Sequence, residues 1–261
     1  MSPETSNSAG VLLVGHGTRD EVGTEQFFEL ERRLADRLGP TPVSAALLEF
    51  QRPSISEAWE SLIAQGVGHI HVAPLLLFAA GHAKQDIPEI IAKCAANSPT
   101  VVRDQSRPIS RHRSILELVV TRITRALEQC NAAPERTAVV MVGRGSHDPC
   151  AQADMRVLTE IAKRQLAVAA VETAFYAMAS PKLPAVLDSV ATSDRYDSVV
   201  VYPHLLFEGR LNQAITRQVQ EASERFPSLS WRMAEYLGPN ELVADAIATR
   251  IEQAAMQPQR R

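Results

Sequence analysis

VLLVGHGTRD (residues 11–20) and VVMVGRGSHD (residues 139–148) are two copies of the stretch that decides the fold of this chain. Each copy opens with four apolar residues, which is typical of a buried strand, and then turns at glycines. PLLLF (residues 74–78) aligns with PHLLF (residues 203–207) at nearly the same offset. The chain is therefore predicted to contain one β-α unit twice.

Strands alternate with amphipathic helices around the first copy. Further strands are predicted at residues 43–50, 69–77 and 101–102, and helices at residues 54–65, 86–95 and 110–129. Regular β-α alternation favours a parallel sheet covered by helices on both faces. We expect an α/β fold of two tandem domains, residues 1–128 and 129–261, each with a small sheet in strand order 2-1-3-4.

The composition is that of an ordered globular protein. The 261 residues are 45% hydrophobic and 22% charged, and 27 basic against 30 acidic residues give a net charge of −3. This balance predicts no nucleic-acid or membrane partner. The polar first ten residues, and the lack of any run near the roughly 20 apolar residues that span a bilayer, predict a cytoplasmic protein.

The cysteines predict neither disulfides nor a thiolate metal site. Cys94, Cys130 and Cys150 are widely spaced, and none belongs to a C-x-x-C pair.

The two copies differ where chemistry is expected. Three potential metal ligands of the first copy are replaced in the second: His16 by Arg144, Glu49 by Ala177 and, after a one-residue gap, His82 by Arg210. Ligands bind parallel sheets at the carboxyl ends of the strands, where the strand order reverses. In a 2-1-3-4 order the three first-copy residues converge on one rim, where two imidazoles and a carboxylate suit Co²⁺ or Fe²⁺ and leave positions open for a substrate.

Three stretches carry a resemblance to a known family. LLVGHGTRD, LLEFQRPSI and APLLLFAAGHAKQDIP resemble the signature stretches of the CbiX/SirB class II chelatases, which insert cobalt or iron into sirohydrochlorin. The longer members of that family are likewise two fused halves, so the resemblance covers nearly the whole chain. It implies sirohydrochlorin and a divalent metal ion as substrates, with no organic cofactor. A single chain could complete the cleft as a monomer.

The resemblance also implies the roles of the rim residues. His16 and His82 would be the metal-binding pair, and Glu49 a further ligand or an acid/base group, so all three are the predicted catalytic and metal residues. Sirohydrochlorin carries several carboxylates, which arginine can pair in bidentate fashion. The predicted substrate-binding residues are Arg19, Arg52, Lys84, Arg144 and Arg210, and the second domain is predicted to be a degenerate repeat that lines the cleft.

The other histidines are predicted to lie outside this site. His147 and His204 do not reproduce the first-copy pattern, and His112 is expected on a helix surface. His69 and His71 alternate with apolar residues, so both rings point to one side of the third strand but too early to reach its carboxyl end.

Two other functions use similar residues. A noncatalytic tetrapyrrole or metal carrier needs the same groups. A histidine phosphatase-like enzyme also places a histidine after its first strand, but in an R-H-G sequence, and here Gly15 stands at the arginine position. The residues do not separate cobalt from iron, the cobalamin from the siroheme pathway, or ligation from proton relay at Glu49.

Overall fold

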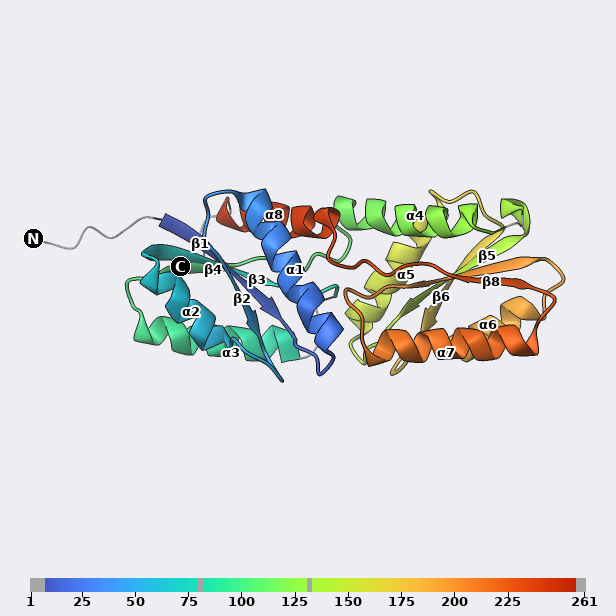
Figure 1. Cartoon of the computed structure of the whole chain (residues 1–261), viewed down its shortest axis with the longest axis horizontal. Helices are drawn as coiled ribbons and strands as arrows, with labels where there is room; N and C mark the ends of the chain where they lie inside the picture. The colour runs from blue at the N-terminus through green and yellow to red at the C-terminus, as the bar shows by residue number, and fades with distance from the viewer. Residues whose placement is uncertain (1–7, 79–81, 131–132, 257–261) are drawn as a thin grey trace, which may run out of the picture. The chain divides into compact units, whose positions relative to one another are not determined.

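Two compact units make up the chain in a computed structural model (Figure 1). The structure describes residues 8–78, 82–130 and 133–256, and for residues 82–84 it describes the backbone alone. Unit 1 comprises Met1–Ser110 and Pro239–Arg261, and unit 2 comprises Arg111–Gly238.

Unit 1 is built on a parallel four-stranded sheet. Its strands are β1 (Ser8–Gly15), β2 (Val43–Leu47), β3 (Val67–Pro74) and β4 (Val102–Gln105). Their order is β2-β1-β3-β4, which confirms the predicted order. Val14 lies opposite Ala46 of β2 and Pro74 of β3, so the carboxyl ends of the three strands share one edge. The second and third strands end earlier than predicted, at Leu47 and Pro74, because the chain turns there toward its helices.

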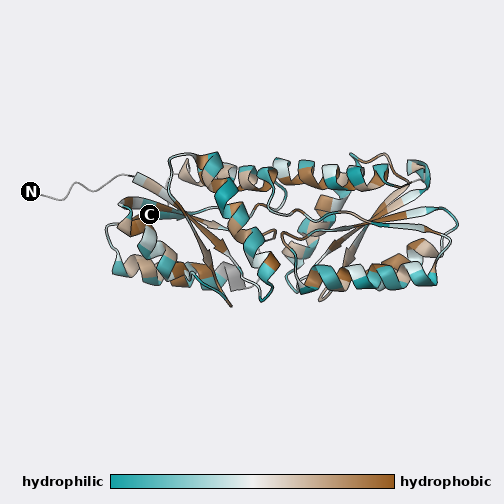
Figure 2. Ribbon diagram, in the orientation of Figure 1, coloured by the Kyte–Doolittle hydropathy of each residue, from teal (hydrophilic) through white to brown (hydrophobic). Residues whose placement is uncertain are grey.

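Helices cover both faces of this sheet. They are α1 (Glu21–Leu38), α2 (Ile55–Ala64), α3 (His82–Asn97) and α8 (Glu241–Ala255). α2 and α3 pack on one face, where Leu12, Trp59 and Ile87 belong to one buried cluster. α1 and α8 contact each other, and α8 also contacts β3 and β4 on the other face. The strands are mostly hydrophobic and the helices are banded, with polar sides turned outward (Figure 2).

Unit 2 repeats this arrangement. Its strands are β5 (Thr137–Gly143), β6 (Ala170–Phe175), β7 (Ser198–Pro203) and β8 (Ser230–Met233), in the order β6-β5-β7-β8. Its helices are α4 (Arg113–Glu128), the short 3₁₀ helix η1 (Pro134–Arg136), α5 (Pro149–Lys163), α6 (Leu183–Ala191) and α7 (Arg210–Arg225). α6 and α7 bury residues in one cluster with the sheet, while α4 contacts α5 and β7.

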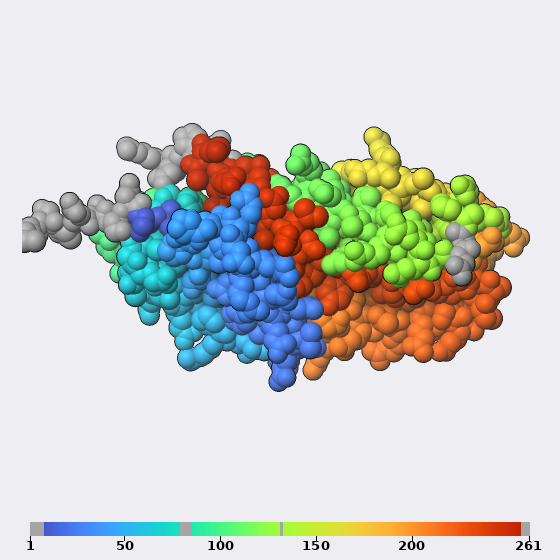
Figure 3. Space-filling model, turned by 45° about the horizontal axis from the view of Figure 1, so that its top comes forward, coloured from blue at the N-terminus to red at the C-terminus, as the bar shows by residue number. Residues whose placement is uncertain are grey.

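The last helix of each copy packs in the unit of the other copy. α4 follows β4 in the chain but belongs to unit 2, and α8 follows β8 but belongs to unit 1. Figure 3 shows residues of α8 (red) beside α1 (blue), and Arg33 and Arg37 of α1 form ion pairs with Glu241 and Asp245 near the start of α8. The compact units therefore do not coincide with the predicted domains 1–128 and 129–261. An amphipathic pattern shows that a helix has an apolar face, but not which sheet that face covers.

Two further expectations concern membranes and thiols. None of the described helices has the length and apolarity needed to cross a membrane. Cys94 is buried, Cys130 half-buried and Cys150 exposed, and all three are free thiols.

Candidate functional site at the carboxyl edge of the sheets

The loop after β1 carries His16 and is held against the loop after β2. The backbone N–H of Glu49 donates to the carbonyl oxygen of His16 at 3.0 Å, and Leu48 N–H donates to Gly15 at 2.9 Å. Gly17 has a φ of 92°, and a Cβ there would collide with the Glu49 carbonyl oxygen. The glycine after His16 is thus required by the close approach of the two loops.

The structure brings His16 and Glu49 to adjacent positions on this edge. Both residues are exposed; His16 directly follows β1, and Glu49 is the second residue after β2. His82 is the first residue of α3, the helix that follows β3, and β3 is the other neighbour of β1. The side chains of His82 and Lys84 lie outside the described part of the chain, so the approach of His82 to the other two residues stays a prediction.

An exposed aromatic side chain extends this edge. Phe50 follows Glu49, is 53% exposed and has a φ of 71°. The guanidinium carbon of Arg19 lies 4.9 Å from the centroid of its ring, within cation-π range. Phe50 was predicted to lie in the second strand, at residues 43–50, and was not among the predicted site residues, but β2 ends at Leu47. The available signal was an aromatic residue next to the candidate ligand Glu49 and three residues before Pro53.

Arg52 lies near the same edge but already has a partner. Its Nη1 lies 2.9 Å from Oε1 of Glu57, and the two side chains are 87% and 42% exposed. Glu57 also completes a capping box with Ser54 at the start of α2. Hydrogen bonds from Ser54, with a smaller contribution from Arg52, hold the pKa of Glu57 below its usual range. Such an exposed ion pair is weak, so Arg52 can exchange Glu57 for another anion.

The corresponding edge of unit 2 has the same backbone with different side chains. Arg144 follows β5 and is exposed, and its carbonyl accepts the N–H of Ala177 at 2.9 Å. Gly145 has a φ of 87°, and a Cβ there would collide with the Ala177 carbonyl. Arg210 is exposed and begins α7 just as His82 begins α3. Arg144, Ala177 and Arg210 therefore occupy the same places in the fold of unit 2 as His16, Glu49 and His82 do in unit 1.

Three further histidines lie apart from His16 and Glu49 in the sequence. His204 follows β7, is buried, and its Nδ1 lies 3.3 Å from the Tyr202 hydroxyl; burial lowers its pKa to about 3. His112 is not a helix-surface residue but the N-cap of α4, with its Nδ1 accepting from Ser114 N–H at 3.3 Å. His147 is exposed in the loop before α5. None of these three reproduces the His16 and Glu49 pair.

Comparisons with known proteins agree with this architecture. The CbiX family model matches residues 10–126 and again residues 138–254. A sirohydrochlorin ferrochelatase of Priestia megaterium is 31% identical over 97% of this chain and 92% of its own length. A sirohydrochlorin cobaltochelatase of the same organism is 29% identical over 93% of this chain and 79% of its own length.

A solved structure gives the same picture in three dimensions. SirB from Bacillus subtilis with Fe³⁺ superposes with a TM-score of 0.83 at 29% identity, covering 95% of this chain and 96% of SirB. The repeated edge loops, the two parallel sheets and the double match to one family model lead to one conclusion. This chain belongs to the CbiX family and contains two copies of its fold.

Proposed function

We propose that this chain is a sirohydrochlorin chelatase that inserts Co²⁺ or Fe²⁺ into the tetrapyrrole, in cobalamin or siroheme biosynthesis. The observation that carries the proposal is the edge of unit 1. There His16 and Glu49 are joined through their backbones, and His82 opens the next helix along the sheet. Relatives named as sirohydrochlorin chelatases match along nearly the whole chain, which supports the same reaction.

Metal insertion replaces the existing ligands of the ion with four ring nitrogens and breaks two pyrrolic N–H bonds. The metal is a substrate, so its protein ligands must release it. The imidazoles of His16 and His82 suit this task, because imidazole nitrogens bind transition ions such as Co²⁺ and Fe²⁺. The exposed carboxylate of Glu49 either completes the coordination of the ion or accepts a pyrrolic proton.

Basic and apolar groups along the edges would hold the macrocycle. Arg19, Arg52 and Lys84 in unit 1, and Arg144 and Arg210 in unit 2, are proposed to pair with the carboxylates of sirohydrochlorin. The exposed ring of Phe50 is proposed to contact the flat face of the tetrapyrrole. In this proposal unit 1 supplies the metal ligands and unit 2 contributes carboxylate contacts.

Anaerobic turnover of metal-free sirohydrochlorin, followed by its absorbance with Co²⁺ and with Fe²⁺, tests the proposal. We expect His16→Ala and His82→Ala each to lower kcat/KM by more than the roughly 10–100-fold typical of residues that only orient a metal ligand. His147→Ala, in the matching loop of unit 2, is the control and is expected to keep wild-type rates. Unchanged turnover in a folded His16→Ala or His82→Ala protein would count against the assignment.

The same experiment separates a chelatase from a noncatalytic carrier, and the residue at position 15 argues against a phosphatase. A carrier would bind sirohydrochlorin or metal stoichiometrically without turnover. A phosphatase of the R-H-G type would need an arginine at position 15. The Gly15 position has no room for one, because a Cβ there would lie 2.7 Å from the Phe27 ring.

A further inference from the structure

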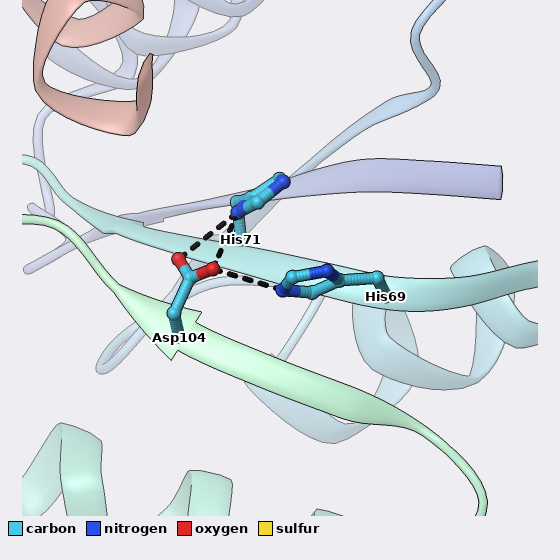
Figure 4. Close-up of side chains that lie close together, drawn as sticks. All are labelled: His69, His71 and Asp104. Carbon is cyan, nitrogen blue, oxygen red and sulfur yellow. Dashed lines mark hydrogen bonds and ion pairs between the residues drawn. The ribbon is translucent and has the colours of Figure 1, made fainter. Parts of the chain in front are cut away.

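A second group of metal-ligating side chains lies in unit 1, away from the edge that carries His16. His69 and His71 of β3 and Asp104 of β4 point toward one another (Figure 4). Asp104 Oδ2 lies 2.8 Å from His69 Nε2 and 2.8 Å from His71 Nδ1. One ligand atom from each residue lies within 4.8 Å of the others, and among the described residues no other group of three does so.

The register of two parallel strands creates this group. His71 lies directly opposite Asp104, and His69 is two residues earlier on the same face of β3. The intervening Ile70, like Val72, packs into the cluster beneath α2 and α3. The imidazoles therefore occupy the opposite sheet face, where α8 contacts both β3 and β4.

Partial burial makes the group chemically unusual. The side chains of His69, His71 and Asp104 are 27%, 10% and 18% exposed. Burial opposes ionisation of Asp104, but hydrogen bonds and charge from His71 and His69 outweigh it and hold the pKa of this carboxyl below its usual range. A largely shielded carboxylate thus faces two imidazole nitrogens, each within hydrogen-bond distance of it.

The fold itself does not require this group. In unit 2, the register positions that correspond to His69, His71 and Asp104 hold Ser198, Val200 and Arg232. These residues offer no imidazole and no carboxylate, and Arg232 would repel a cation. The same sheet is therefore built without the cluster, which is a feature of unit 1 alone among the described residues.

We propose that His69, His71 and Asp104 form a second binding site for a divalent transition ion of the Zn²⁺ or Co²⁺ class. Two nitrogen ligands and one carboxylate oxygen suit such ions, and water completes the coordination. His71 precedes Pro74, the end of β3, by three residues, which is about 10 Å along a strand. The ion therefore does not share the edge with His16, and it ties the edge strand β4 to β3.

Metal binding by a protein without the edge histidines tests this site. The His16→Ala/His82→Ala double variant, purified without a histidine tag and stripped of metal, is dialysed against Co²⁺ and followed by visible absorption and by Tm. We expect about one bound Co²⁺ per chain and a metal-dependent rise in Tm, because an ion that binds only the folded state stabilises it. Adding Asp104→Asn or His69→Gln should abolish both effects.

Two further variants test whether the bound Co²⁺ occupies the site formed by His69, His71 and Asp104. Arg232→Gln stands at the position in unit 2 that corresponds to Asp104, and it should leave binding by the double variant unchanged. If Asp104→Asn does not fold, the more exposed His69→Gln provides the test. No Co²⁺ bound by the folded double variant, or equal binding after His69→Gln, would overturn the proposal. Because the readout is metal binding and not turnover, the outcome does not depend on whether the chain is a chelatase.

Discussion

At the residue scale, the two possible roles of Glu49 can be separated by one substitution. Glu49→Gln keeps the size of the exposed side chain but removes the charge that is proposed to bind a metal or accept a proton. We expect kcat to fall by about 10²-fold or more, the usual contribution of a positioned proton-transfer group. Turnover and Co²⁺ affinity are measured on the same protein. A fall in kcat at constant affinity identifies proton transfer, parallel losses identify ligation, and no loss of either refutes both roles.

The buried His204 predicts a specific pH dependence of stability. Its pKa is lowered by burial from 6.5 to about 3, so above pH 6.5 the ring is neutral in both the folded and the unfolded protein. As the pH falls below 6.5, His204 becomes protonated in the unfolded state but stays neutral in the folded state. Unit 2 should then lose up to about 1.4 kcal/mol of stability per pH unit until the folded pKa is reached.

His204→Leu tests this, since Leu75 occupies the corresponding buried position after β3 in unit 1. Urea unfolding between pH 4 and pH 7 is followed through Trp231, with Trp59 replaced by Phe in both proteins. We expect the variant to lose this part of the pH slope. Exposed His147→Ala serves as the control, and an unchanged slope in His204→Leu would contradict the assignment.

Individual residues show which parts of the candidate site could be predicted from the sequence. His16 and Glu49 stood out because the second copy replaces them with Arg144 and Ala177, and the structure places both pairs at equivalent loop positions. Asp104 gave no such signal, because its meeting with His71 depends on the register of two strands that are distant in the chain. Phe50 was missed because alternation alone does not reveal where a strand ends.

At the scale of elements, the paired loops after β1 and β2 depend on Gly17. Gly17→Ala combines a positive φ with a collision against the Glu49 carbonyl. Gly39→Ala at the end of α1 is a matched control, because φ is 63° but no atom lies within 4 Å of the added Cβ. We expect about 1 kcal/mol of destabilisation for Gly39→Ala and clearly more for Gly17→Ala, measured by urea unfolding. Equal costs would show that the loop contact contributes nothing.

The elements themselves were largely predictable. Periodicity located α2, which was predicted at residues 54–65 and spans Ile55–Ala64, where Ser54 and Glu57 form a capping box. The short edge strand β4 was predicted at residues 101–102, half its observed length, because Arg103, Asp104 and Gln105 carry no apolar signal. Strand ends beside the candidate site were the least predictable, since loop contacts set them.

At the scale of the whole molecule, the exchanged helices mean that removing the C-terminal helix α8 should destabilise unit 1 and not unit 2. Val243, Ile247 and Ile251 of α8 are buried in unit 1. Each buried side chain of this kind contributes roughly 1.5–3 kcal/mol, so losing all three approaches the total stability of a small domain. A chain ending at Gly238 should retain unit 2, whose residues are all present, and should lose the cooperative unfolding of unit 1.

Trp59 and Trp231 report on the two units separately in this truncation. We expect the Trp231 urea transition to persist and the Trp59 transition to broaden or vanish. A chain ending at Met256 removes only the residues after α8 and is the control. A normal Trp59 transition without α8 would contradict the expected role of this helix.

The helix exchange also sets an order of assembly on the ribosome. All residues of unit 2 have been synthesised once Gly238 is added, although its first residue follows nearly the whole of unit 1. Unit 1 begins first but cannot close until Ala255 has been made, because α8 covers β3 and β4. Domains usually fold during translation in order from the N-terminus. Here unit 2 has all its residues before unit 1 does, although unit 1 begins first. The half of the protein that carries the proposed metal ligands is the last to be finished.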